Sequence, residues 1–486
     1  MKTLFFICLC AMIAFGCKSS DSEKKTASVS LKDALAAHID TSISAADDFF
    51  MFSNGRWIKE NAIPGEESSW GIGNLVVNEN LDRLKIINVN AAKEEAKIGS
   101  ATQKIGHFWT VAMDSAGIEK QGLSALKPYL LKIDSIDNMA SLVGVSAALN
   151  RIGVSSLFGD YIGQDDKNSE VMSYKLWQGG IGLPEREYYF NKDSSTQNIR
   201  RQYLAYIKSI LMLQGQDSAV ANSSAQAIMQ LETSLAKSSR KLADLRDPYT
   251  NYNKMAIKDL SKLTPAINWP DFLNAIQVKN IDSVIVGQPE FFKTLNTVLN
   301  STSINDWKNY LRFRLIRSYA FALPDTFGVA TFNFSKLLSG ANERKPRWKR
   351  VLDAEEDAMG ELLGQLYVKE FFNEKTKKRY EDLVEAIRTV YKDRIQNLTW
   401  MSDSTKQKAY LKLAAIKKKV GYPDKWKDFS AMDISNESYV QNIINANLWW
   451  HDRETDKLGK PVDRDEWEMT PQTYNAYYNP SNNEIV

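Results

Sequence analysis

The spacing of apolar residues along the chain is mostly that of amphipathic helices. From about Leu31 onward, apolar positions recur at intervals of three and four, and proline and glycine fall at sparse break points. No segment recurs at a fixed period, which argues against a solenoid. The pattern predicts a mainly α fold, with helices over 101–114, 198–214, 223–238, 285–299 and 359–373.

Two further helices are expected to form a hairpin. A helix over 380–398 carries an apolar stripe with charged residues between its members. A second helix is expected to begin at Ser404, where Gln407 completes a capping box, and to run to Gly421. We therefore expect an antiparallel αα unit whose stripe is buried. The stripe consists of Leu383, Ile387, Val390, Tyr391, Ile395 and Leu398.

The last thirty residues differ in character from the helical body. An aromatic and threonine-rich run over Gln472–Tyr478, bounded by Asn479-Pro480, is the best strand candidate in the chain. The sequence stops at Ile485-Val486 without a polar tail or a helix cap. We expect a further apolar segment to continue from this point.

The start of the chain has the features of an export signal. A basic residue, Lys2, precedes a short apolar stretch over 4–16, which is shorter than the roughly 20 residues of a spanning helix. Gly16-Cys17 then fits bacterial lipoprotein processing, so we expect a signal peptide over 1–17 and a lipid on Cys17. The alternative is an ordinary secretory signal. A polar tether over 18–35 would hold the folded part off the membrane.

Composition and charge narrow the function further. Among 486 residues, 43% are hydrophobic and 25% charged, which is typical of globular proteins. The 62 Lys and Arg against 59 Asp and Glu give a net charge of +3, so nucleic acid is not an expected partner. All three cysteines (Cys8, Cys10 and Cys17) fall in the first 17 residues, which excludes a disulfide scaffold and a thiol nucleophile in the body.

The residues needed for a zinc site are scattered. The only histidines are His38, His107 and His451, and no His-Glu-x-x-His occurs. Each is expected to be a surface or hydrogen-bonded polar residue, so we expect no metal and no catalytic residue in this chain. Nucleotide-binding glycine motifs are also missing. The pair Asp47-Asp48 is expected to cap a helix.

Several segments, in order along the body, resemble the neprilysin family of zinc metallopeptidases, including its bacterial endopeptidases. Each motif alone is weak evidence for this resemblance, whereas the whole set in the same order is strong evidence. The matching segments are Asp47-Asp48-Phe49-Phe50 with Gly55-Arg56-Trp57 and Ile63-Pro64; Gly182-Leu183-Pro184-Glu185-Arg186-Glu187-Tyr188-Tyr189; Arg246-Asp247-Pro248 with Tyr252-Asn253; Leu398-Thr399-Trp400 and Gly421-Tyr422-Pro423; and Asn475-Ala476-Tyr477-Tyr478.

The resemblance implies a large helical cap lobe over 75–430 that restricts substrate size. Short β-containing segments over 36–74 and 431–486 would belong to an incomplete thermolysin-like catalytic lobe. The zinc site of the complete family enzyme would then lie beyond Val486, so this chain alone is expected to be inactive.

The resemblance also assigns substrate-binding residues. Asn475 would hold the substrate backbone through its side-chain amide, and Ala476 would pair with the substrate as an added strand. Ser69 stands where some relatives carry an arginine that grips a substrate carboxylate, which puts a preference for free peptide C-termini in doubt.

Together these observations predict the N-terminal portion of a neprilysin-like metalloendopeptidase. Its partners would be peptides and, through a lipid anchor, a membrane of the bacterial cell envelope. The alternative is a non-catalytic peptide-binding or adaptor lipoprotein.

Overall fold

The computed structural model describes residues 35–486, which divide into two compact units between Ala62 and Ile63. Cys17 and its signal segment lie outside the described residues. In the first unit, η1 (Ala36–His38) precedes α1 (Phe49–Glu60). The Asp48 carboxylate accepts a hydrogen bond from the Met51 N–H at 2.9 Å, which confirms the predicted helix cap for that residue.

A close steric contact explains why glycine occupies position 55 in the Gly55-Arg56-Trp57 segment. A Cβ atom on Gly55 would lie 2.9 Å from the Cβ of Asp40, closer than real Cβ contacts allow. Asp40 also forms an ion pair with Lys59 at 2.6 Å and accepts hydrogen bonds from Ser42. Gly55 thus lets α1 pack directly on the segment that precedes it.

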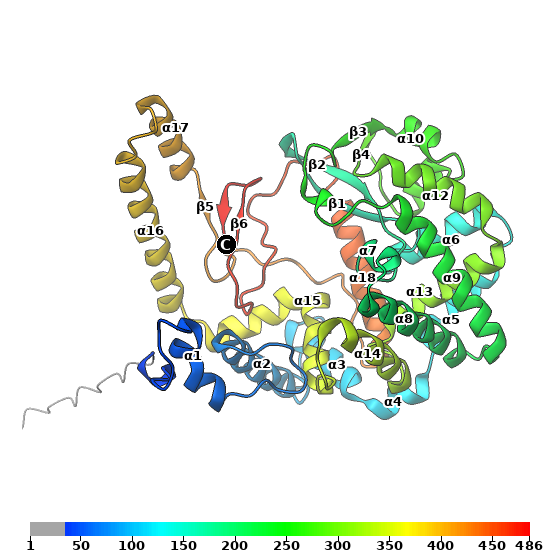
Figure 1. Cartoon of the computed structure of the whole chain (residues 1–486), viewed down its shortest axis with the longest axis horizontal. Helices are drawn as coiled ribbons and strands as arrows, with labels where there is room; N and C mark the ends of the chain where they lie inside the picture. Colours follow the sequence, from blue (N-terminus) through cyan, green and yellow to red (C-terminus); the bar gives the residue numbers. More distant parts are fainter. Residues whose placement is uncertain (1–34) are drawn as a thin grey trace, which may run out of the picture. The chain divides into compact units, whose positions relative to one another are not determined.

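The second unit is built mainly from helices (Figure 1), which confirms the mainly α class. Three predicted helices appear with nearly the expected bounds, as α3, α8 and α9. No helix from Leu35 onward is long and apolar enough to cross a bilayer. The helices are α2 (Ile72–Ala91), α3 (Ala101–Met113), α4 (Ser115–Gln121), η2 (Ser124–Leu126), α5 (Lys127–Asp134), α6 (Met139–Arg151), α7 (Glu187–Phe190), α8 (Ser194–Leu213), α9 (Ser218–Ser238), η3 (Asp244–Arg246), α10 (Ile257–Leu263), α11 (Trp269–Ala275), α12 (Pro289–Ser301), α13 (Ile304–Tyr319), α14 (Asp325–Ser339), α15 (Arg347–Phe371), α16 (Glu374–Gln396), α17 (Asp403–Ala414) and α18 (Tyr439–Thr455).

A four-stranded sheet lies among these helices, and the sequence pattern did not predict it. Its strands are β1 (Gly159–Asp165), β2 (Asn168–Trp177), β3 (Asn253–Ala256) and β4 (Ser283–Val286), in the order β1-β2-β4-β3. β2 and β4 are parallel, and the other two pairs are antiparallel. The helix predicted over 285–299 is therefore wrong at its start, because β4 ends at Val286 and α12 begins only at Pro289.

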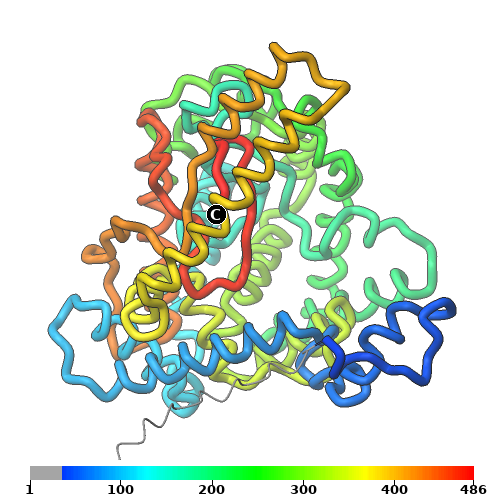
Figure 2. The backbone as a smooth tube through the Cα atoms, turned by 90° about the vertical axis from the view of Figure 1, so that its left-hand side faces the viewer, coloured from blue at the N-terminus to red at the C-terminus, as the bar shows by residue number. Residues whose placement is uncertain are grey.

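A second, smaller sheet contains the end of the chain. It joins β5 (Lys417–Lys418), β7 (Glu484–Ile485) and β6 (Tyr478–Asn479), in that order. Figure 2 shows the C-terminal residues turning back beside the segment that follows α17. The predicted strand over Gln472–Tyr478 is largely wrong, because only Tyr478 lies in β6 and the residues before it are irregular.

The α16–α17 hairpin forms as predicted (Figure 1), but the side chains of its apolar stripe are not buried. Leu383 is 52% exposed and Tyr391 58%, and neither helix contains a buried residue. The second helix starts at Asp403, one residue before the expected Ser404, with Ser402 as its cap, and it ends at Ala414 rather than Gly421. The hairpin therefore has an exposed apolar surface in this structure.

The core of the second unit is rich in aromatic side chains. Trp269, Trp307, Tyr203, Tyr310 and Phe313 are fully buried. Burying one side chain of this kind stabilises a fold by roughly 1.5–3 kcal/mol. These residues of the core belong to the helices around the four-stranded sheet and not to the small C-terminal sheet.

Candidate substrate-binding site

The β6 strand forms one edge of the small sheet. The Tyr477 N–H donates to the Val486 carbonyl at 3.1 Å, and the Val486 N–H donates to the Tyr477 carbonyl at 2.9 Å. Because successive main-chain groups of a strand alternate in direction, those of Tyr478, the first residue of β6, face the opposite side. An extended peptide laid along this outer side would find the main-chain groups of Tyr478 open to pairing, and it would have to displace the Asn475 side chain to reach the Ala476 N–H.

Asn475, the predicted substrate-binding residue, is exposed and immediately precedes this edge. Its side-chain oxygen accepts a hydrogen bond from the Ala476 N–H at 2.8 Å. The Asn475 N–H itself donates to the Thr473 carbonyl at 3.0 Å. The side chain of Asn475 is thus engaged by the main chain of the next residue, Ala476.

The neighbouring Tyr477 is held in its neutral form. Burial, together with the nearby carboxylates of Glu468 and Glu484, raises the pKa of Tyr477 to about 12. At neutral pH its hydroxyl therefore remains protonated and able to donate a hydrogen bond.

Two hollows adjoin the small sheet. One, of ≈ 650 Å³, is lined by residues of α16, of β5 and of the segment 420–428. The other, of ≈ 610 Å³, is lined by residues of α15 and α18 and of the segment 460–470. Volumes of this size are typical of small-molecule and peptide side-chain pockets. Both hollows carry many charged side chains, which suits a polar ligand.

A buried ion pair forms the wall that the two hollows share. Glu361 of α15 accepts a hydrogen bond from the Lys427 N–H at 2.5 Å and forms an ion pair with the Lys427 ammonium group. The Lys427 ammonium also donates to the Trp467 carbonyl at 2.6 Å. The two side chains are only 8% and 10% exposed, so removing either charge would leave the other buried and unpaired.

The Gly182–Tyr189 motif folds around a buried carboxylate instead of lining a hollow. Glu232 of α9 accepts hydrogen bonds from Tyr189 at 2.6 Å, from Tyr203 at 3.0 Å and from the Gly182 N–H at 3.1 Å. A Cβ on Gly182 would lie 1.8 Å from the Tyr203 hydroxyl oxygen, so only glycine fits there. Burial raises the pKa of Glu232, and the charges of Arg314 and Arg317 oppose this shift. The motif therefore serves packing and not contact with a ligand.

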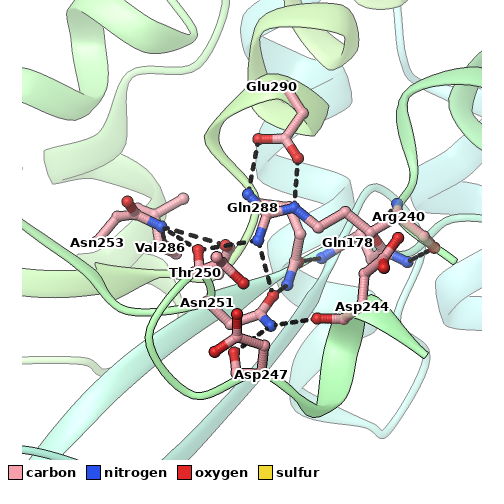
Figure 3. Close-up of polar contacts among 11 residues, drawn as sticks. Gln178, Arg240, Asp244, Asp247, Thr250, Asn251, Asn253, Val286, Gln288 and Glu290 are labelled. Carbon is pink, nitrogen blue, oxygen red and sulfur yellow. Dashed lines mark hydrogen bonds and ion pairs between the residues drawn. The ribbon is translucent and has the colours of Figure 1, made fainter. Parts of the chain in front are cut away.

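The segment around Arg246-Asp247-Pro248 is likewise held by a polar network (Figure 3). Arg240 pairs with both oxygens of Glu290, at 2.5 and 3.1 Å. Asn251 donates to two carbonyl oxygens of the loop 244–251, at 2.8 and 2.7 Å, and accepts from Gln288 at 2.6 Å. These contacts fix the loop to α12 and to the end of α9, which again is a structural role.

The histidines each have a local partner. The His107 ring bonds to the Gln103 amide at 2.6 Å, the His451 ring bonds to the Ile276 carbonyl at 2.6 Å, and the His38 ring packs edge-on against Trp57. Within residues 35–486, no group of three or more His, Cys, Asp or Glu side chains is placed to hold a metal ion. The described residues therefore do not fit a zinc site, and we derive no catalytic step through zinc from them.

Known proteins match this chain over most of its length. The model of Peptidase family M13 matches residues 45–423. Neprilysin-3 of Drosophila melanogaster is 30% identical over 477 residues, which cover 92% of this chain and 60% of that protein. Human endothelin-converting enzyme 1 is 29% identical over an alignment of 502 positions, which covers 99% of this chain and 64% of that protein.

A solved structure supports the same relationship. The crystal structure of the zinc metalloprotease Zmp1 of Mycobacterium tuberculosis, in complex with an inhibitor, superposes with a TM-score of 0.87 at 33% identity. The match covers 93% of this chain and 68% of the Zmp1 chain. This chain spans 60–65% of the length of the curated relatives that it matches.

Proposed function

Because the chain belongs to peptidase family M13, the neprilysin-type zinc metallopeptidases, we propose that it forms the helical lobe and the substrate-binding edge of a metalloendopeptidase. The observation that carries this proposal is the open outer side of β6, together with the main chain of Ala476 and the side chain of Asn475, which lie two and three residues before that strand. The substrate class is peptides, bound through their main chain.

Recognition through the main chain follows from the chemistry of this edge. The Ala476 N–H and carbonyl would pair with the peptide as an added strand. The Asn475 amide offers both a donor and an acceptor to a peptide group, whatever side chain the peptide carries. Binding would exchange the present Asn475–Ala476 hydrogen bond for bonds to the peptide. The helical lobe would limit which substrates reach the edge by their size.

The sharpest test of this proposal is binding of peptides with blocked main-chain groups to the full chain. Fluorescence polarisation should detect binding of labelled extended peptides with several unrelated side-chain sequences. N-methylation of alternate peptide nitrogens should abolish binding in one register and spare it in the other, because only alternate groups face β6. Equal binding of both methylated series would overturn the strand-addition role.

In a longer polypeptide that carries a zinc site, Asn475 should also matter for catalysis. There Asn475→Ala should lower kcat/KM roughly tenfold to a hundredfold, with zinc content unchanged, because one or two hydrogen bonds to the substrate are lost. The loss should be similar for peptides that differ in side chains. Unaltered kcat/KM on several peptides would reject the role of Asn475.

A second candidate function is peptide binding without catalysis, as an adaptor lipoprotein. The support for this candidate is the edge strand β6, beside the lack of a group of three metal-ligating side chains among residues 35–486. The coding sequence downstream of the Val486 codon separates the two functions. An open frame that encodes His-Glu-x-x-His supports the peptidase, and a stop codon supports the binding protein.

We further propose that the protein is anchored in the bacterial cell envelope by a lipid on Cys17, which suits the short apolar stretch and Gly16 before it. Mass spectrometry of the native membrane fraction should find diacylglycerol on Cys17. A Cys17→Ser variant should lose the lipid and leave the membrane fraction. Recovery of wild-type protein processed at another residue would contradict the anchor.

A further inference from the structure

The segment that leads to the β6 edge is held by one buried side chain. Over 459–483, Gln472 is the single buried residue, with 6% of its surface exposed. The residues that follow it, 473–476, are all exposed. No side chain of 473–476 is buried, so the buried Gln472 directly before this stretch is the nearest buried anchor on its N-terminal side.

Gln472 is held by a carboxylate of α15. Its side-chain amide donates to Glu356 at 2.6 Å and to the Gly360 carbonyl at 2.8 Å. The hydroxyl of Thr470 donates to the other oxygen of Glu356. The two oxygens of one carboxylate thus hold two residues of the segment, three and five positions before Asn475. Asn80 of α2 donates to the Gln472 carbonyl at 3.2 Å and adds a main-chain contact.

A break in α15 lies at the same place. Met359 has φ −151° and ψ 35°, outside the helical range. Carbonyl groups on either side of it accept hydrogen bonds from other elements, that of Ala358 from the Trp450 indole at 2.9 Å and that of Gly360 from Gln472 at 2.8 Å. Gln472 therefore docks where α15 departs from regular helical geometry.

A glycine lets the segment approach the helix. A Cβ on Gly364 would lie 2.8 Å from the Cδ of Pro471 and 2.9 Å from the side-chain oxygen of Gln472. These distances are shorter than real Cβ contacts, and the proline ring cannot move away by rotating. Any larger residue at 364 would push the segment off α15.

We propose that Glu356 and Gln472 are positioning residues for peptide binding, which fix 473–476 so that the main chain of Ala476 meets the peptide in register. This inference rests on the proposed function of the β6 edge and names the groups that hold that edge in place. Glu356 touches no peptide in this scheme and acts only through the segment that it anchors.

The test compares variants of the full chain, with Asn475→Ala as the reference for the edge itself, by amide hydrogen exchange and by peptide affinity. Glu356→Ala removes both anchoring bonds, whereas Glu356→Gln keeps them, because its amide can accept from Gln472 and donate to the Thr470 hydroxyl. Glu370→Ala removes an exposed acid of the same helix as a control. Gly364→Ala displaces the segment without touching the carboxylate.

Glu356→Ala and Gly364→Ala should each weaken binding of a labelled extended peptide about tenfold and speed exchange of the Tyr477 amide. The peptide affinity of Glu356→Gln should stay within about threefold of the wild-type affinity, and that of Glu370→Ala should equal the wild-type affinity. The double variant Glu356→Ala/Asn475→Ala should bind more weakly than Asn475→Ala alone, but by clearly less than the product of the two single losses, because Glu356 acts partly through Asn475 and partly through the main chain of Ala476. Thermal unfolding of each variant checks that the fold persists.

Two contrary results have different meanings. If Asn475→Ala weakens binding while Glu356→Ala and Gly364→Ala leave affinity and Tyr477 exchange unchanged, the positioning role is overturned and the peptide edge stands. Fully additive losses in the double variant also overturn it, because they make Glu356 independent of the edge. If Asn475→Ala and Glu356→Ala both bind peptides as the wild type does, the edge itself is wrong and the positioning role fails with it.

Discussion

The side-chain oxygen of Asn475 accepts a hydrogen bond from the Ala476 N–H at 2.8 Å, directly before the edge strand β6. A peptide that adds to this edge must compete with that bond. Asn475→Ala should therefore speed exchange of the Ala476 amide in the free chain, because its acceptor is lost. Asn475→Asp keeps an oxygen acceptor and should retain the slower exchange. NMR exchange rates measure both, and an unchanged Ala476 rate in the alanine variant would mean that the bond is not formed in solution.

Removal of the buried Glu232 carboxylate should strongly destabilise the second unit. Glu232→Ala leaves the hydroxyl groups of Tyr189 and Tyr203 without their acceptor, beside two arginines, while the Gly182 N–H keeps the Tyr189 oxygen as an acceptor. We expect a loss of roughly 3–5 kcal/mol in the free energy of unfolding. Urea denaturation gives this value. Glu232→Gln, which retains an acceptor, should cost less, and a loss below about 1 kcal/mol for alanine would contradict the role of the cluster.

Glu355 should make stability fall as the pH rises. This residue of α15 is fully buried beside Asn88, and burial raises the pKa of its carboxyl well above the ordinary value. Between the unfolded pKa of about 4.3 and the folded one, the folded chain binds the proton and the unfolded chain does not, so stability is lost with increasing pH, by up to about 1.4 kcal/mol per pH unit.

Glu355→Gln should flatten this pH dependence, because the amide keeps the shape without titrating. Urea denaturation of both proteins from pH 5 to pH 8 provides the comparison. Glu356 and Asp160 also have raised pKa values, so the difference between the two curves isolates Glu355. Parallel curves would show that Glu355 is ionised in the fold.

The exposed hairpin allows a matched test of burial. Ile387 of α16 is 42% exposed, whereas Ile316 of α13 is fully buried. Ile316→Ala should cost roughly 2–5 kcal/mol and Ile387→Ala less than about 0.5 kcal/mol in the free energy of unfolding. The same urea measurement serves both variants. Equal costs would show that the stripe of α16 is covered in solution.

The helical part of the fold was predictable because it depends on local periodicity. α3, α8 and α9 have long amphipathic patterns and polar caps, and Ser100, Asp193 and Asp217 bond to the first-turn N–H groups. β4 was missed for a physical reason: its short apolar run, Val284-Ile285-Val286, lacks a period that separates strand from helix. Gly287, which packs against the Trp177 ring, and Pro289 were the available signals for the break.

The candidate site was less predictable, because it depends on contacts between distant segments. Aromatic and threonine residues favoured a strand over Gln472–Tyr478, but Gln472 is drawn onto α15 by Glu356, more than a hundred residues earlier. The stripe of α16 was expected to be buried because amphipathic helices usually are, and the pattern cannot say by what. Asn475 and Ala476 came from resemblance alone, and their role stays a prediction.

The polar network around Arg240 affects how the results of a variant screen should be interpreted. A charged side chain near a family motif, with several polar partners, has the appearance of a functional group, yet the contacts of Arg240 to Glu290 and to the loop 244–251 hold the chain together. A screen that scores peptide binding per cell would give Arg240→Ala the same result as loss of a residue that touches the peptide. Measuring the amount of folded protein beside peptide binding would separate the two: few molecules of normal affinity for the Arg240 variant, and many molecules of reduced affinity for a variant of a residue that touches the peptide.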